Sequence, residues 1–146
     1  MARLWQFHHD WVVMAPADDV YAVCADVDAY PTWWREIRSI ERIDDESGLA
    51  LVRSVLPYTL RLQMTRELED PSARRLRVRL GGDLTGWAEF GIAAGRGGAS
   101  AVTYRQEVEV TAPVLRRVAP LLGPVLRANH TLMMRSCERG MAHALD

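Results

Sequence analysis

The chain has 146 residues, of which 49% are hydrophobic and 25% are charged, and its formal net charge is -1 at pH 7. These values are typical of one soluble domain, and they exclude a disordered chain or a protein whose overall field attracts nucleic acid. No apolar run approaches the roughly 20 residues that span a bilayer, and polar residues interrupt the N-terminal stretch where a signal peptide would be apolar. We therefore expect one cytoplasmic domain over residues 1–146, with no stable membrane insertion.

The N-terminal segment predicts a strand followed by a short helix. Apolar and polar residues alternate from Trp5 to Met14, which is the period of a strand with one buried face. Pro16 suits the first turn of a helix, and the acidic pair Asp18-Asp19 suits the positive end of its dipole. The buried side of this helix is predicted to carry Val20, Val23, Cys24 and Val27.

An aromatic segment, Asp28 to Trp34, comes next. Pro31 disfavours helical geometry at Tyr30, so we expect a break or a second, one-turn helix that ends at Trp33 and Trp34. Large aromatic side chains with a polar handle suit a lid over a cleft. An equally good interpretation is that Trp33 only plugs the open end of the sheet.

The middle of the chain predicts six strands in hairpin succession. Turn residues separate most of them, and linkers this short join antiparallel neighbours. The predicted strands are Ile37–Ile43, Leu49–Leu56, Thr59–Leu68, Arg74–Leu80, Leu84–Ala93 and Ser100–Val110.

The C-terminal stretch, roughly Pro113 to Leu145, has the only long helical periodicity. Its apolar stripe is predicted to contain Leu126, His130, Met133, Cys137, Met141 and Ala144, with Val125, Met134 and Leu145 at its edges. Together these elements predict an α+β fold: a curved, seven-stranded antiparallel sheet wrapped around a long C-terminal helix, with two short helices after the first strand.

Four polar residues fall on predicted apolar faces, and these are the candidates for chemistry: His9, Arg66, Gln106 and His130. A buried polar group without a partner costs about 1–3 kcal/mol, so each requires a protein partner, water or a ligand. Each also has a structural alternative. His130 could be a satisfied core histidine, His9 could lie near a sheet edge, Arg66 could reach solvent or a glutamate, and Gln106 could bond a neighbouring strand.

The sequence favours neither a metal site nor a covalent catalyst. His8 and His9 point to opposite faces of a strand, and no other spacing of His, Cys, Asp and Glu is typical of a metal site, so we predict no metal and no cofactor. The two cysteines form no CxxC motif and are predicted to be free, buried thiols. Acid–base chemistry by His130 with Tyr104 is the one catalytic pairing that the pattern allows.

The order of elements resembles the helix-grip fold of the START-like (SRPBCC) superfamily, which includes Bet v 1-like proteins and polyketide cyclases. The opening is similar to that of this superfamily in Ala15-Pro16, Val20-Tyr21, Asp26, Tyr30-Pro31 and Trp33. The run Gly82 to Trp87 and the pair Asn129-His130 resemble a bacterial branch usually described as polyketide cyclase/dehydrase-like. This resemblance implies a largely apolar cavity between the sheet and the terminal helix, used for hydrophobic or aromatic small molecules.

Three functions are compatible with these observations. The first is binding of a lipid, isoprenoid or polyketide-like molecule, with candidate cavity residues His130, His9, Gln106, Tyr104, Arg66, Trp33, Leu126, Met133 and Cys137. The second is an aromatase/cyclase-type enzyme that moves protons in the same cavity. The third is a protein-interaction module, for which Trp33, Trp34 and Trp87 are the candidate exposed apolar residues. The sequence leaves open whether side chains fill the cavity and whether the chain forms a homodimer.

Overall fold

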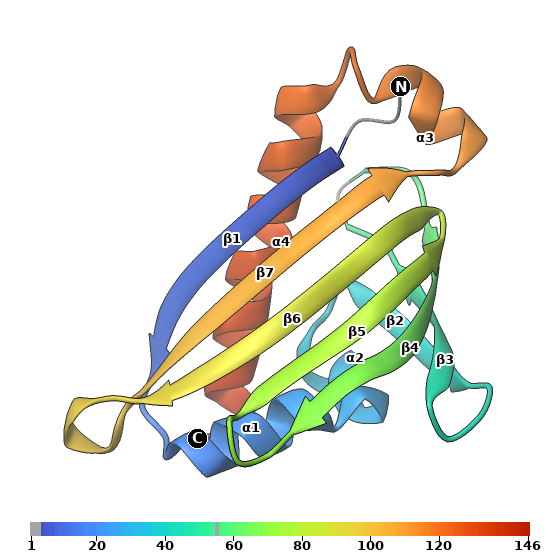
Figure 1. Ribbon diagram of the computed structural model, residues 1–146. Coiled ribbons are helices and arrows are strands. Elements are labelled where there is room, and N and C mark those ends of the chain that lie inside the picture. Colours follow the sequence, from blue (N-terminus) through green and yellow to red (C-terminus); the bar gives the residue numbers. More distant parts are fainter. Residues whose placement is uncertain (1–3, 55) are drawn as a thin grey trace.

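A computed structural model describes residues 4–54 and 56–146 (Figure 1). Seven antiparallel strands form one sheet in the order β1-β7-β6-β5-β4-β3-β2, so β1 and β2 are its two edges. The strands are β1 (Leu4–Val13), β2 (Ile37–Arg42), β3 (Ser47–Val52), β4 (Leu60–Asp70), β5 (Arg75–Gly82), β6 (Leu84–Ala94) and β7 (Ser100–Val110). The α+β fold predicted from the sequence is confirmed.

The helices gather at the ends and on the concave face of this sheet (Figure 1). Helix α4 runs along the concave face, α1 and α2 lie at one end, and α3 lies at the other end beside the start of β1. Their bounds are α1 (Ala17–Ala25), α2 (Tyr30–Trp33), α3 (Pro113–Val118) and α4 (Gly123–Ala144), with single-turn 3-10 helices η1 (Val27–Ala29) and η2 (Arg96–Gly98).

The strand pairing follows the alternation of the sequence. In β6 and β7, Phe90 pairs with Tyr104 and Ala88 with Gln106, which places all four side chains on the concave inner face. The intervening residues, such as Glu89 and Arg105, pair on the convex outer face. The alternation changes in β4, where a register shift between Arg66 and Leu68 inserts an extra residue and bends the strand.

The strand bounds differ from the predicted ones by a few residues. The strand expected over Leu49–Leu56 is observed at Ser47–Val52, and Val55 of the expected range lies outside the described residues. For the segment from Asp28 to Trp34 we expected a break or a one-turn helix, and the structure has the end of η1 followed by the one-turn helix α2. The expectation that Pro31 keeps Tyr30 out of helical geometry was wrong, because Tyr30 begins α2 with helical dihedral angles.

The C-terminal helical stretch is broken where the sequence analysis treated it as continuous. Helix α3 ends at Val118, and α4 begins at Gly123 with Pro124 in its first turn. Pro120 and Pro124 have no N–H for the backbone bonds that a continuous helix requires, which explains the break. The stripe on α4 also differs: Met134 is buried and Ala144 is exposed, because the second half of the helix packs against α1 and α2.

Two groups of buried side chains hold the layers together. The larger group surrounds Trp11, Trp34 and Phe90 and includes the fully buried Cys24 and Cys137, which are free thiols as predicted. The smaller group surrounds Trp5 and joins Leu80, Val108 and Ala119 at the α3 end. Between them the inner face is not completely filled.

Candidate functional site

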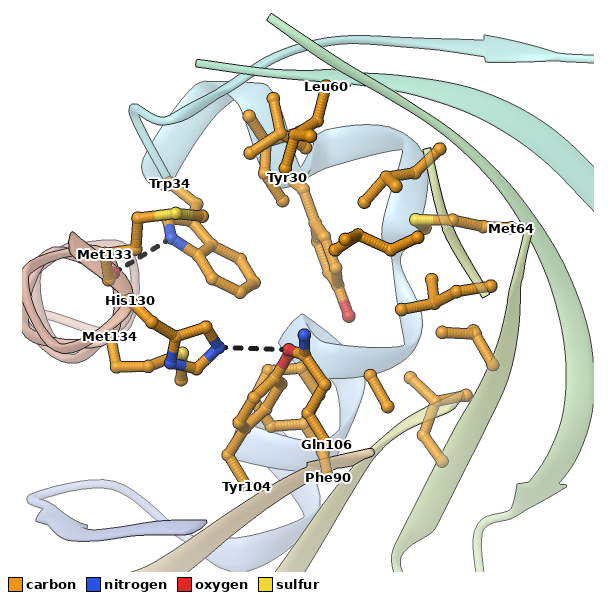
Figure 2. A pocket seen from close by; sticks show the side chains of 18 residues that line it. Tyr30, Trp34, Leu60, Met64, Phe90, Tyr104, Gln106, His130, Met133 and Met134 are labelled. Carbon is orange, nitrogen blue, oxygen red and sulfur yellow. Dashed lines mark hydrogen bonds between the residues drawn. The ribbon is translucent and has the colours of Figure 1, made fainter. Parts of the chain in front are cut away.

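The unfilled space lies between the inner face of the sheet and α4, and it has two lobes of about 110 Å³ each. The inner lobe lies toward α2, and its wall includes Tyr30, Trp34, Phe90 and Tyr104 (Figure 2). The outer lobe lies toward α3 and includes Trp5, Phe7, Leu115 and Leu126. The residues that line both lobes are Val52, Leu60, Leu84, Gln106, His130 and Met133.

A chain of three polar side chains lies where the two lobes meet. The side-chain oxygen of Gln106 accepts a hydrogen bond from the Tyr104 hydroxyl and contacts Nε2 of His130 at 3.1 Å (Figure 2). A carboxamide oxygen can only accept, so His130 must carry its proton on Nε2. Both lone pairs of the Gln106 oxygen are then used, which fixes the orientation of its amide group.

The fixed orientation leaves the amide nitrogen of Gln106 free to bind a ligand. Figure 2 shows this nitrogen directed into the cavity, away from His130. Gln106 is only 7% exposed, and within residues 4–54 and 56–146 its amide nitrogen has no hydrogen-bond partner. This donor faces the cavity rather than the packed core, so an occupant with an acceptor atom at this position could accept its hydrogen bond.

Burial keeps the two titratable groups of this set, His130 and Tyr104, uncharged at neutral pH. Burial, together with the smaller effects of the His9 and Arg127 charges, lowers the pKa of His130 to about 3. Burial likewise raises the pKa of the Tyr104 hydroxyl far above its ordinary value, and the neighbouring Cys137 adds to this effect. The chain therefore offers neutral hydrogen bonds rather than charges.

The other side of the His130 ring packs against β1. Its ring stacks on Phe7 with centroids 3.7 Å apart, and the His9 ring lies at 5.4 Å. Nδ1 of His130 is buried without a hydrogen-bond partner among the described residues. The imidazole is thus held by stacking on one side and by Gln106 on the other.

The remaining donors of the inner lobe are already satisfied by the backbone. The Tyr30 hydroxyl donates to the carbonyl of Cys24 at 2.5 Å, and Trp34 Nε1 donates to the carbonyl of Met133 at 3.1 Å. At the outer lobe, Ser54 donates to the side-chain oxygen of Asn129 at 2.6 Å. Among the described residues of the inner lobe, the amide nitrogen of Gln106 is consequently the donor that stays uncommitted (Figure 2).

The structure brings together five of the residues that the sequence singled out: Gln106, Tyr104, His130, Met133 and Leu126 all line a lobe. Their common signal was a polar or bulky residue on a predicted apolar face. The structure also places Gln106 and His130 in direct contact, although 24 residues separate them in the chain.

Four other candidates lie outside the lining. His9 is on the edge strand β1, where it stacks near His130 but borders neither lobe. Arg66 lies just before the bend in β4 and forms an ion pair with Glu69 at 3.2 Å. Cys137 is fully buried in the half of α4 that packs toward α1. Trp33 stacks on Trp34 and contacts Gly140, so the neighbouring Trp34 lines the cavity in its place.

Several lining residues gave no separate signal in the sequence. Met64, Leu76, Phe90 and Met134 are ordinary members of apolar faces, and nothing in the pattern distinguishes a cavity wall from a filled core. Asn129 was noted only as part of the Asn129-His130 pair, yet its side chain borders the outer lobe. Its polarity next to an apolar stripe is the signal that could have identified it.

Two kinds of site are absent from the described part of the chain. No group of three or more His, Cys, Asp or Glu side chains there is arranged to hold a metal ion. None of the helices in residues 4–54 and 56–146 combines the length and the apolar character needed to cross a bilayer.

The fold and the cavity define a helix-grip protein, and the similar solved structures agree. A protein from Thermus thermophilus superposes with a TM-score of 0.83 at 17% identity, covering 97% of each chain. The Zhui aromatase/cyclase from Streptomyces has a TM-score of 0.77 at 16% identity, covering 98% of this chain and 94% of its own. A START superfamily protein from Mycobacterium smegmatis has a TM-score of 0.75 at 17% identity, covering 96% of each chain.

The family follows from the sequence itself. Residues 5–142 match the family described as polyketide cyclase / dehydrase and lipid transport, and the chain belongs to this family. The comparison with curated protein sequences gives no match. At 16–17% identity the solved structures establish the fold and nothing finer.

Proposed function

We propose that this protein binds an apolar small molecule that carries a hydrogen-bond acceptor, such as a carbonyl oxygen, in the cavity between the sheet and α4. The single observation that carries the proposal is the uncommitted amide nitrogen of Gln106, held in orientation by Tyr104 and His130. The surrounding wall is almost entirely aliphatic, aromatic or methionine. A few oriented polar groups in an apolar pocket are typical of small-molecule sites.

The same chemistry narrows the class of ligand. A lipid, isoprenoid or polyketide-like molecule with a ketone or quinone oxygen would place its apolar body in the lobes and its oxygen against Gln106. A carboxylate or phosphate is disfavoured deep in the cavity, because the polar groups there are neutral and no cationic side chain of residues 4–54 and 56–146 lines either lobe.

The alternative function, aromatase/cyclase-type catalysis, needs a group that exchanges protons near neutral pH. His130 is the candidate, but burial lowers its pKa to about 3, which makes it a weak base at pH 7. The Zhui aromatase/cyclase shares the fold, and this likeness is the support for an enzyme. Turnover of a poly-β-keto substrate that is lost in His130→Ala would establish catalysis, and binding without turnover would favour a carrier.

The third function, a protein-interaction module, is not supported by the positions of Trp34 and Trp87. Trp34 is 5% exposed and lines the cavity, and Trp87 is covered by the Arg77 guanidinium, 4.1 Å from the ring centroid. These two residues therefore do not form an exposed apolar patch.

The binding proposal is tested with two fluorescent probes that differ in polarity. Nile red carries a carbonyl oxygen, whereas diphenylhexatriene has no polar atom. We expect saturable binding of both to the wild type, and Gln106→Leu should weaken Nile red by about tenfold while leaving diphenylhexatriene unchanged, because one hydrogen bond is lost. Gln63→Leu, an exposed glutamine on β4, is the matched control and should bind both probes like the wild type.

A second variant shows where the probes bind. Met133 lines both lobes, so Met133→Trp should fill the space and abolish binding of both probes in a protein that still melts cooperatively. Absence of saturable binding to the wild type, or equal binding of Nile red by wild type and a folded Gln106→Leu, would contradict the proposal.

A further inference from the structure

An exposed apolar surface lies at the α3 end of the molecule. We call it the apolar tip, and it consists of Val114, Leu121, Leu122 and Val125, which are 63%, 82%, 40% and 47% exposed. These residues lie on α3, on the turn after it and on the first turns of α4. Large aliphatic side chains gathered in one short segment and open to solvent are typical of an interaction site.

The opposite side of this segment is firmly attached to the domain. Ala119 is buried against Trp5, and Gly123 lies beside the Trp5 ring, at a distance where an added Cβ would make an ordinary contact of 3.5 Å. Leu115 and Leu126 point inward and line the outer lobe. The segment that carries the tip therefore packs on the core through its other side, and it borders the outer lobe of the cavity.

The charge around the tip differs sharply from that of the whole chain. From Thr111 to Cys137 there are four arginines and no aspartate or glutamate. The rest of the chain carries fourteen arginines against nineteen acidic residues, so the net charge of -1 conceals a positive C-terminal segment on a negative body. Arg116 and Arg117 are exposed, and neither forms an ion pair within the described residues.

We propose that the apolar tip docks this protein onto an anionic lipid surface, with Leu121 and its neighbours in the interfacial layer and Arg116 and Arg117 against the headgroups. Apolar side chains and cations on one short helical segment are the two features that bind peripheral proteins to such surfaces. The docking is peripheral, and it brings the outer lobe of the cavity next to the lipid.

The charge of the arginines favours a lipid surface over a second copy of the chain as the partner that covers the tip. A symmetric dimer through the tip would bring the Arg116-Arg117 pairs of both copies together without any acid in the segment to neutralise them. An anionic surface neutralises the same charges. This inference stands on the exposed tip and its charge, so it holds or fails separately from ligand binding in the cavity.

The experiment is flotation with vesicles of phosphatidylcholine alone and of phosphatidylcholine mixed with phosphatidylglycerol. We expect binding to the anionic vesicles only, weakened by added salt. Leu121→Asp and the double variant Arg116→Glu/Arg117→Glu should each reduce it by about tenfold or more. The matched control is Met14→Asp, because Met14 is 78% exposed and follows β1 at the opposite end of the sheet (Figure 1).

Each result decides the proposal. All variants replace exposed residues, so equal melting temperatures would show that they fold, and Nile red binding would show that the cavity is unaffected. No binding of the wild type to anionic vesicles, or equal loss in Met14→Asp and Leu121→Asp, would overturn the inference. A dimer in solution that Leu121→Asp dissociates would overturn it as well, since a second copy would then cover the tip.

Discussion

The two faces of the sheet each bury a polar group, and they stabilise it in different ways. On the outer face, Glu89 is 5% exposed and its carboxylate accepts hydrogen bonds from Arg75 at 2.7 Å, Arg77 at 3.3 Å and Arg105 at 2.8 Å. On the inner face, Gln106 occupies the neighbouring position of the β6–β7 ladder and bonds only neutral partners. One pair of strands thus presents a charged cluster on one side and an uncharged one on the other.

The two faces differ in charge because their polar side chains differ in access to water. Arg75 and Arg105 are about half exposed, so their charges stay hydrated while they neutralise Glu89. No such route exists beneath α4, where a charge would be far from solvent. The inner face can therefore hold polar groups only when they are neutral and hydrogen-bonded. In such surroundings the Gln106 amide favours a ligand with a neutral acceptor over a charged one.

The largest expected effect concerns the close packing of α4 on α2, which forms one wall of the space beneath α4. An added Cβ at Gly140 would lie 1.8 Å from the backbone oxygen of Trp33, so Gly140→Ala should reduce the free energy of unfolding by about 2–4 kcal/mol. Gly123→Ala on the same helix makes an ordinary 3.5 Å contact and should change stability by less than about 1 kcal/mol. Urea denaturation measures both, and an unchanged Gly140→Ala would show that this close contact is dispensable.

The outer face is tested by removing its central charge. Glu89→Gln leaves three arginines without their shared carboxylate and should cost about 2 kcal/mol, whereas Glu67→Gln, which breaks only the Arg79 pair at 3.1 Å, should cost less than about 1 kcal/mol. If the two variants have equal stability in urea, the cluster is no more than a set of surface pairs.

The pH dependence of this cluster has a defined sign. Burial by itself raises the pKa of Glu89, but the hydrogen bonds from Arg105 and Arg75 and the positive charges outweigh it and lower the pKa overall. The contribution of Glu89 is therefore complete above its ordinary pKa, and it is lost as the pH falls through the lowered pKa of the folded state.

The smallest expected effect is a loss of stability on mild acidification, which arises from His130 on the neutral inner face. The folded pKa of His130, about 3, lies below the ordinary value of 6.5, so the unfolded chain binds the proton first. Stability is complete above pH 6.5 and falls as the pH decreases toward 3. The loss between pH 6.5 and pH 5.5 should be about 1 kcal/mol.

Urea denaturation at pH 7, 6 and 5 measures the slope with which the free energy of unfolding falls as the pH decreases. His130→Phe, which preserves the stacking on Phe7, should reduce the slope, and His143→Gln, at an exposed position of the same helix, should keep it. A wild type whose stability is constant over this range would mean that His130 accepts a proton in the folded state as easily as in the unfolded one, and the inner face would then tolerate charge.

The sequence predicted the strand succession and the faces of most residues because these depend on local periodicity. Gln106, Tyr104 and His130 could be placed near the sheet–helix interface from alternation and helical spacing alone. The choice between Trp33 and Trp34 could not be made, because a one-turn helix gives adjacent side chains directions that no period fixes. Arg66 does share the inner face, where it pairs with Val78 as the alternation predicted, but it lies next to the irregularity in β4 and its guanidinium pairs with Glu69, so it lines neither lobe.

The amino-acid sequence specifies the set of elements, their order and their apolar faces, and its match over residues 5–142 identifies the family. The tertiary structure alone decided where space remains between those faces, since a cavity depends on sheet curvature and on how closely Gly140 lets α4 approach α2. It also decided which polar groups meet. The bond between Gln106 and His130 joins residues from β7 and α4, and no local pattern encodes a contact between separate elements.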